Sequence, residues 1–143
     1  MVPAAEIVDV LSGEAESREV RNTEDLKRWI REGLPFTSLE AAMERFGLKR
    51  EEVSWALDLP LRTLARRKQE RRLSPGESDR LFRVVRIAVQ AANVLGGREE
   101  ASRWLHAPNR ALGGQTPLEL LDTDLGSRQV EDVLGRIEHG VYS

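Results

Sequence analysis

The chain has 143 residues, a formal net charge of −2 and no cysteine, which leaves room for one domain or two small ones. The lack of cysteine excludes a disulfide framework and a cysteine-rich metal site, and a reducing cytoplasm is the expected location. No run approaches the roughly 18 apolar residues that a membrane span needs. The N-terminus lacks the cationic stretch and apolar core of a signal peptide, so neither secretion nor membrane association is expected.

Charge is distributed unevenly along the chain. Residues 1–34 and residues 97–143 each carry 5 basic and 8 acidic side chains, a net charge of −3. Residues 35–96 carry 12 basic and 8 acidic side chains, a net charge of +4. This segregation indicates an anionic partner for the middle segment alone. A solvated helix face is the alternative interpretation of the same charge.

Helical periodicity and helix caps recur along the chain, and no segment alternates polar and apolar residues as a strand does. We therefore predict an all-α fold. Residues 1–20 are weakly patterned and are predicted to be a loose leader. Gly96 and Gly97 end the longest apolar helix and divide the rest into two lobes, residues 21–96 and residues 97–143.

Five helices are expected in the first lobe. Thr23 and Ser38 are typical first residues of helices, and residues 74–77 (Ser-Pro-Gly-Glu) form a capping box with proline at the first helical position. The helix after this box has an apolar stripe so broad that we expect neighbours to bury it on several sides. The expected helices cover residues 23–32, 38–46, 50–58, 61–71 and 74–95.

The second lobe is expected to contain shorter elements. A short helix ends near His106, and a loop follows over residues 108–114. A second capping box covers residues 116–119. The last helix is expected to begin at Ser127 and to end at Gly140.

Two short helices joined by a tight turn occupy residues 50–72, the size of a helix-turn-helix unit. Residues 61–72 carry six basic side chains and one acidic side chain. On a helical wheel Leu61, Leu64 and Ala65 share the side expected to pack on the domain, which leaves the opposite arc for base edges and phosphates. No turn glycine separates the two helices, and an amphipathic surface helix stays an alternative. The residues expected to contact DNA are Arg62, Thr63, Arg66, Arg67, Lys68 and Arg71.

The C-terminal forty residues contain the most specific motifs. They run from Trp104 through Asn109 to Gly113 and Gly114, continue over residues 116–121, and close over residues 135–142. These motifs resemble the toxin-binding domain of Xre-type antitoxins of the MbcA/ParS group, which partner RES-domain toxins. Three earlier segments are similar to the same family, so the resemblance covers roughly residues 24–143. Those segments are residues 32–35, 62–68 and 73–81.

The resemblance implies a helix-turn-helix DNA-binding lobe followed by a small helical toxin-binding lobe. The implied partner is a RES-domain toxin, encoded beside the antitoxin, that depletes cellular NAD. The antitoxin would block access to the toxin's active site, and the complex would repress its own promoter. The NAD chemistry would belong to the partner, so no cofactor is expected in this chain. A homodimer is also expected, because helix-turn-helix proteins commonly read two half-sites by two-fold symmetry.

Physical chemistry supports a binding role for the C-terminal motifs. Trp104 offers a large apolar area and an indole N–H, and glycines in a turn bring the backbone close to another surface. An apolar and aromatic tip at a chain end can enter a cleft. The alternative is that Trp104 is a core residue and the glycines only form turns. The residues expected to bind toxin are Trp104, Asn109, Leu112, Gly113, Gly114, Arg136, Glu138, His139, Gly140, Val141 and Tyr142.

Catalysis is not expected. His106 and His139 lie at predicted helix ends, and neither has a companion at metal-ligand spacing. No glycine-rich phosphate loop follows a strand. Two other interpretations stay open beside a toxin-neutralising antitoxin. One is a stand-alone helix-turn-helix repressor whose C-terminal lobe only dimerises, and the other is an adaptor that caps a toxin but does not bind DNA.

Overall fold

The computed structural model describes residues 2–13 and 20–140. Within these ranges the chain is helical, and its one strand-like feature is an isolated bridge between Pro35 and Arg72. The all-α prediction is confirmed. None of the described helices is both long and apolar enough to cross a membrane. The helices are α1 (Ala4–Ser12), α2 (Thr23–Glu32), α3 (Phe36–Phe46), α4 (Arg50–Ala56), α5 (Leu61–Glu70), α6 (Pro75–Leu95), α7 (Arg98–Leu105), η1 (Arg110–Leu112), η2 (Leu118–Leu120) and α8 (Asp124–Glu138).

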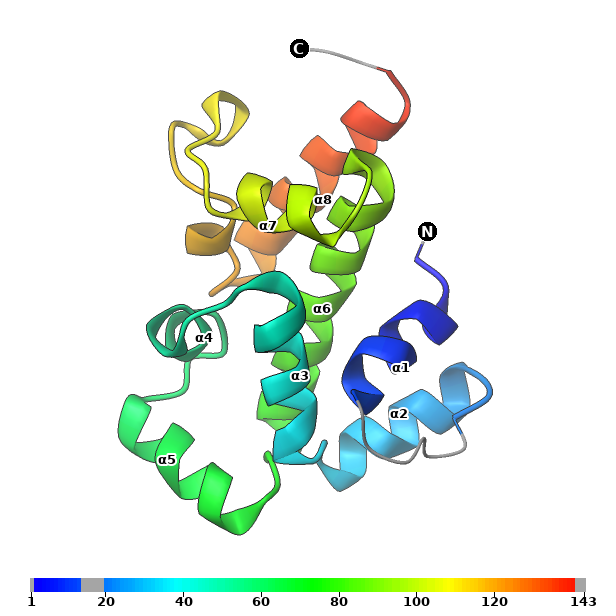
Figure 1. The fold of residues 1–143 in the computed structure, drawn as a ribbon, viewed down its shortest axis with the longest axis vertical. Helices are drawn as coiled ribbons and strands as arrows, with labels where there is room; N and C mark the ends of the chain where they lie inside the picture. The colour runs from blue at the N-terminus through cyan, green and yellow to red at the C-terminus, as the bar shows by residue number, and fades with distance from the viewer. Residues whose placement is uncertain (1, 14–19, 141–143) are drawn as a thin grey trace.

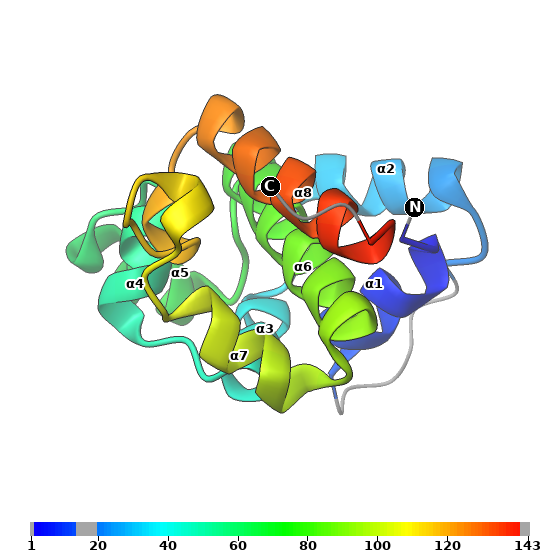
Figure 2. The same cartoon turned by 90° about the horizontal axis from the view of Figure 1, so that it is seen from above.

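Helix α6 is the axis of the molecule (Figure 1). It starts at the predicted capping box, in which the Ser74 N–H donates to the Glu77 carboxylate at 2.8 Å and the Glu77 N–H donates to Ser74 Oγ at 3.2 Å. Helices α1, α2, α3, α7 and α8 all pack against it, and Figure 2 shows α8 lying along its length. This packing explains the breadth of the apolar stripe. The fully buried apolar residues of α6 include Leu81, Val85, Ile87, Ala88 and Ala91.

The end of α6 agrees with the sequence, because Gly96 is its C-cap with a φ of +106°. Helices that precede this glycine in the chain and helices that follow it both pack on α6. The division into lobes of residues 21–96 and 97–143 therefore stays a prediction.

The N-terminal segment is a packed helix, so the prediction of a loose leader is wrong for residues 4–12. Ile7, Val10 and Leu11 are at most 2% exposed, and α1 packs against α3 and α6. Ser38, expected to open a helix, instead lies inside α3 and donates its hydroxyl to the Leu11 carbonyl at 2.5 Å. Helix α1 is thus held by residues distant in sequence, which local patterning does not show.

A glycine turn ties the end of α2 to the start of α6. Gly33 has a φ of +96°, and a Cβ there would collide with the Leu73 carbonyl oxygen. The Leu34 N–H donates to Ser78 Oγ at 2.7 Å, and the Leu73 N–H donates to the Leu34 carbonyl at 2.9 Å. Both the left-handed backbone and the close approach require glycine.

Helix α2 begins at the predicted Thr23, but two helices are capped by residues other than the expected ones. Asn22, not Thr23, caps α2, and its side chain accepts from the Asp25 N–H at 2.8 Å. Thr123, not Ser127, caps α8, and its hydroxyl accepts from the Gly126 N–H at 2.9 Å. In each case the oxygen of an earlier side chain, from a residue type that also favours this position, makes the capping hydrogen bond.

Candidate DNA-binding and toxin-binding surfaces

The turn between α4 and α5 forms without glycine. Asp58 takes the left-handed conformation with a φ of +49°, which aspartate tolerates better than most residues. The Ser54 hydroxyl donates to the Leu59 carbonyl at 2.6 Å and closes the turn. Pro60 then precedes the first residue of α5. The missing turn glycine is therefore no obstacle to a helix-turn-helix geometry.

The wheel orientation predicted for α5 is wrong. Leu64 is buried, but Leu61 is 43% exposed and Ala65 is also exposed. Thr63 and Arg67 are half-buried instead. The helix is thus rotated about its axis from the orientation that apolar residues alone suggest. Its outward face carries Leu61, Arg62, Ala65, Arg66 and Gln69. Gln69 is not among the residues expected to contact DNA.

Arg67 accounts for the rotation. Its guanidinium makes a bidentate contact with the Glu77 carboxylate, with Nε–Oε1 at 2.8 Å and Nη2–Oε2 at 3.1 Å. A third bond joins Arg67 Nη1 to Glu70 at 3.0 Å. The Glu77 side chain is only 7% exposed, and planar fork-to-carboxylate pairs are the strong class of charged hydrogen bonds. The prediction that Arg67 faces away from the core is therefore wrong, because this arginine clamps α5 to the start of α6. Its contact with DNA stays a prediction.

The Arg67–Glu77 pair also shifts both pKa values. Burial acts to raise the pKa of the Glu77 carboxyl, but hydrogen bonds from Arg67 and from the Ser74 backbone outweigh it and leave the pKa below its ordinary value. Hydrogen bonds to Glu77 and Glu70 raise the already high pKa of Arg67. Both groups stay charged across the physiological pH range.

Acid should remove the stabilisation that Glu77 provides. Because the folded-state pKa lies below the unfolded one, the unfolded chain binds more protons, and the free energy of unfolding falls as the pH drops through the folded-state pKa. The free energies of unfolding of the native chain and of Glu77→Gln, measured with urea, should differ most near neutral pH. The difference should shrink from about pH 4 downward. A difference that stays constant to pH 2 would contradict this role of the carboxylate.

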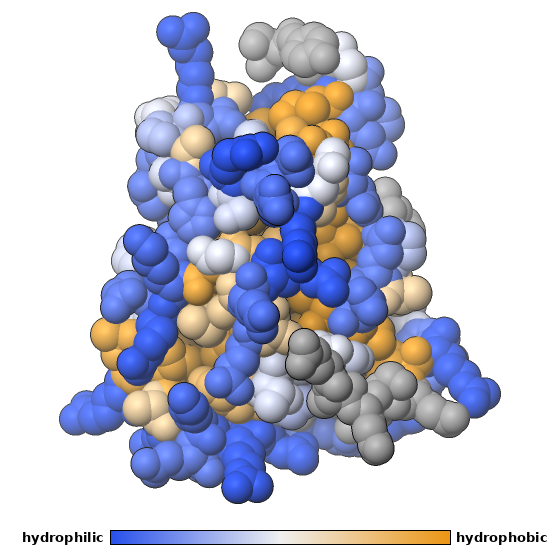
Figure 3. All heavy atoms as spheres, viewed as in Figure 1, coloured by the Kyte–Doolittle hydropathy of each residue, from blue (hydrophilic) through white to orange (hydrophobic). Residues whose placement is uncertain are grey.

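The other basic residues of this region differ in their surroundings. Arg62 is exposed and has no recorded partner among the described residues. The Arg66 side chain is 63% exposed, and its recorded contact is with Glu70 at 3.6 Å. Lys68 is exposed on the rim of an apolar groove of about 670 Å³ between α3 and α5, and Figure 3 shows apolar surface there at the lower left. Arg71 is exposed and ends α5 with a φ of +65°. The two cations best placed for an outside partner are Arg62 and Arg66.

The loop over residues 109–114 has the predicted turn geometry. Asn109 Oδ1 accepts from the Ala111 N–H at 2.9 Å, and the Gly114 N–H donates to the Asn109 carbonyl at 2.9 Å. Gly113 and Gly114 have φ values of +69° and +85°, and a Cβ on either would meet nothing within 4 Å. Leu112 is 7% exposed. It therefore anchors the loop and does not present its side chain to a partner, contrary to its place among the expected toxin contacts.

The remaining expected toxin contacts lie on two helices. Trp104 on α7 is partly buried and packs on the core, so it is available to a partner only in part. Arg136, Glu138 and His139 are exposed at the end of α8, and Gly140 follows with a φ of +71°. Val141 and Tyr142, the expected apolar tip, lie outside the described residues.

Two residues that sequence analysis did not assign to the site connect α4 with the C-terminal elements. His106 bonds to Glu52 through Nε2 at 3.0 Å and to the Ser102 carbonyl through Nδ1 at 2.7 Å. Trp55 is 56% exposed, and its indole N–H donates to the Glu119 carbonyl at 3.0 Å. The sequence feature that could have identified Trp55 as a site residue is its place on the polar side of α4. Among the described residues, no group of three or more histidines and acidic side chains is arranged to hold a metal.

Comparison with known proteins gives two adjacent family matches. Residues 25–86 match the antitoxin Xre-like helix-turn-helix domain, and residues 90–140 match the antitoxin Xre/MbcA/ParS C-terminal toxin-binding domain. The chain is 38% identical to an antitoxin Xre of Yersinia enterocolitica over 98 residues, which are 67% of this chain and 66% of that protein. It is 31% identical to an antitoxin Xre of Photorhabdus laumondii over 116 residues, which are 80% of this chain and 78% of that protein.

The fold also resembles a solved structure. A chain of the M. tuberculosis MbcT–MbcA toxin–antitoxin complex aligns with a TM-score of 0.56 and 27% sequence identity. The alignment covers 76% of this chain and 96% of that chain. The two family matches meet between residues 86 and 90, inside α6.

Proposed function

Because the chain belongs to the Xre/MbcA/ParS antitoxin family, we propose that it neutralises a cognate RES-domain, NAD-depleting toxin by blocking the toxin's active site. We further propose that it binds promoter DNA as a homodimer and represses its own operon. In this proposal the chain has no catalytic activity and needs no cofactor. The NAD chemistry belongs to the toxin.

The observation that carries the proposal is the separation of two candidate surfaces. Helix α5, with Arg62 and Arg66 exposed, lies at one end of the long axis of the molecule, and the C-terminal end of α8 lies at the other (Figure 1). DNA bound at α5 would leave the end of α8 accessible. This arrangement suits a protein that holds a toxin and an operator at the same time.

Co-expression with the RES-domain protein encoded beside the chain tests the toxin-binding part. We expect the two proteins to co-purify and the chain to restore growth that the toxin alone arrests. A chain that binds its promoter but neither co-purifies nor restores growth would instead be a stand-alone repressor. Light scattering tests the homodimer, which should have about twice the 16.1 kDa mass of one chain.

Replacing Arg62 and Arg66 together with alanine should weaken promoter binding. The slope of log affinity against log salt concentration should fall by about 0.9 for each DNA phosphate that the variant no longer neutralises. Fluorescence anisotropy with labelled promoter DNA at several salt concentrations measures both effects. The matched control is Arg103→Ala with Arg128→Ala, since those side chains are 74% and 72% exposed on other helices. An unchanged slope in the Arg62 and Arg66 variant would place the DNA elsewhere, and a native chain that does not bind its promoter would favour a toxin-capping adaptor.

A further inference from the structure

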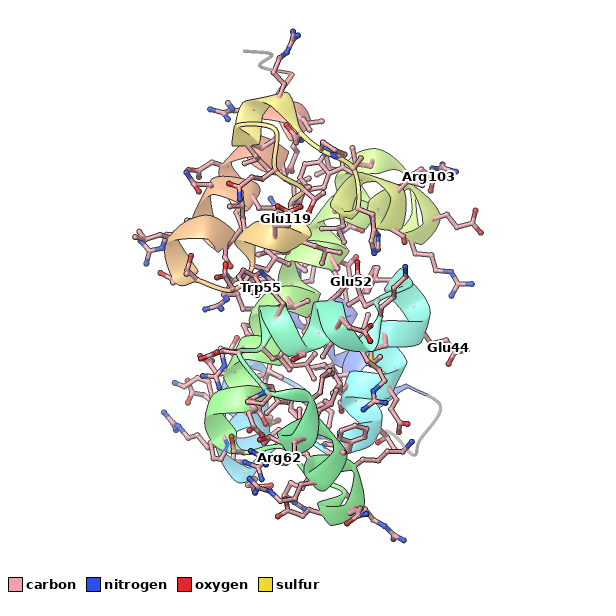
Figure 4. All side chains as sticks on the ribbon, turned by 90° about the vertical axis from the view of Figure 1, so that its left-hand side faces the viewer. Glu44, Glu52, Trp55, Arg62, Arg103 and Glu119 are labelled. Carbon is pink, nitrogen blue, oxygen red and sulfur yellow. The ribbon has the colours of Figure 1, made fainter. Side chains whose placement is uncertain are left out.

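A groove of about 320 Å³ lies between α4 and η2. Trp55 forms part of it and is 56% exposed, one of three large apolar side chains with such exposure among the described residues. Figure 4 shows Trp55, Glu52 and Glu119 close together on one side of the molecule. The indole N–H of Trp55 donates to the backbone carbonyl of Glu119 at 3.0 Å. This hydrogen bond holds an exposed aromatic ring in a set position.

Three carboxylates share the groove with this ring. Glu51, Glu52 and Glu119 all line the groove, and no lysine or arginine is among its described lining residues. The Glu52 carboxylate is already bonded to the Lys49 N–H at 2.7 Å and to His106. Glu51 and Glu119 are exposed, and neither carboxylate has a recorded partner among the described residues. The groove thus combines an aromatic surface with two carboxylates that are available to a cation.

We propose that this groove binds an arginine or lysine side chain from the surface of the cognate toxin. The face of an indole ring attracts a cation, and a carboxylate beside it accepts the charge-assisted hydrogen bonds that a guanidinium donates. The same carboxylates repel phosphate groups, which disfavours DNA as the occupant. His106, Thr116, Leu118 and Glu119 come from the part of the chain that matches the toxin-binding domain, which favours the toxin over a second copy. The inference rests on the proposed function.

The test measures affinity for the purified RES-domain protein encoded beside the chain, by isothermal titration calorimetry at low and high salt. The first variant is Glu51→Gln with Glu119→Gln. Because Trp55 bonds to the backbone carbonyl of Glu119, glutamine at position 119 leaves that hydrogen bond in place. We expect the dissociation constant at low salt to rise about tenfold and its salt dependence to weaken.

Two further comparisons separate the contribution of the carboxylates to toxin affinity from the contribution of the Trp55 ring. Trp55→Leu should weaken toxin binding, while Trp55→Phe, which keeps an aromatic face but loses the indole N–H that positions the ring, should weaken it less. The charge control is Glu44→Gln with Glu99→Gln, which removes two exposed carboxylates on α3 and α7 that have no recorded partner among the described residues. The control should change the dissociation constant less than about twofold.

Each outcome decides the inference. If the native chain binds the toxin and the Glu51 and Glu119 variant binds it equally well, the groove has no role and the proposed function still stands. If the native chain does not bind the toxin, the proposed function fails and the groove inference fails with it. If the variant has a lower mass in light scattering while its toxin affinity is unchanged, the groove holds a second copy of this chain, which overturns the inference.

Discussion

Deleting residues 140–143 is expected to abolish toxin neutralisation and leave the fold intact. The last fully buried residue of α8 is Leu134, and Arg136, Glu138 and His139 beyond it are exposed. A Cβ on Gly140 would meet nothing within 4 Å, so this glycine is not packed against the rest of the described chain. A single aromatic anchor buried in a partner's pocket contributes about 2 kcal/mol or more, which corresponds to roughly a 30-fold loss of affinity when it is removed.

Growth of cells that co-express the toxin measures the effect of this truncation, and co-purification measures the complex directly. The thermal unfolding midpoint and promoter binding serve as controls and should be unchanged. If the truncated chain still protects cells and co-purifies with toxin, the tip is not the neutralising element. Contacts would then have to be sought at Trp104 and over residues 109–114, where the loop is exposed around its two glycines.

Replacing Arg67 with alanine is expected to destabilise the protein by about 3 kcal/mol, because it leaves the buried Glu77 carboxylate without its partner. Helix α5 should also lose its attachment to α6, so promoter binding should fall as an indirect result. Arg66→Ala, at a 63% exposed side chain, should change stability by less than about 0.5 kcal/mol. Urea unfolding of both variants measures the difference.

A double-mutant cycle identifies the role of this arginine. Arg67→Ala combined with Glu77→Gln should be less destabilised than the sum of the two single changes, because glutamine does not leave a buried charge unpaired. Arg67→Lys should recover only part of the stability, since an ammonium cannot make the bidentate contact. An Arg67→Ala variant that is as stable as the native chain but no longer binds DNA would show that Arg67 is a DNA contact after all.

Local sequence signals were sufficient for much of the helical framework. The capping box at Ser74 and Glu77 and the terminating Gly96 are short-range features, and α6 has both in the structure. The turn over residues 109–114 was likewise predictable, because asparagine and paired glycines favour it within a few bonds. The family motifs added the expected order of a helix-turn-helix domain and a toxin-binding domain, which the two family matches confirm.

The orientation of α5 and the packing of α1 depended on tertiary structure. On α5 the apolar pattern predicted that Leu61 and Ala65 face inward, but the ion pair between Arg67 and Glu77 turns the arginine side inward. A charged residue can be buried only when a partner neutralises it, and here that partner lies ten residues away on another helix. Sequence by itself therefore determined the helices, their caps and the family, whereas contacts between distant segments determined which arginines face solvent and whether Trp55 borders an acidic groove.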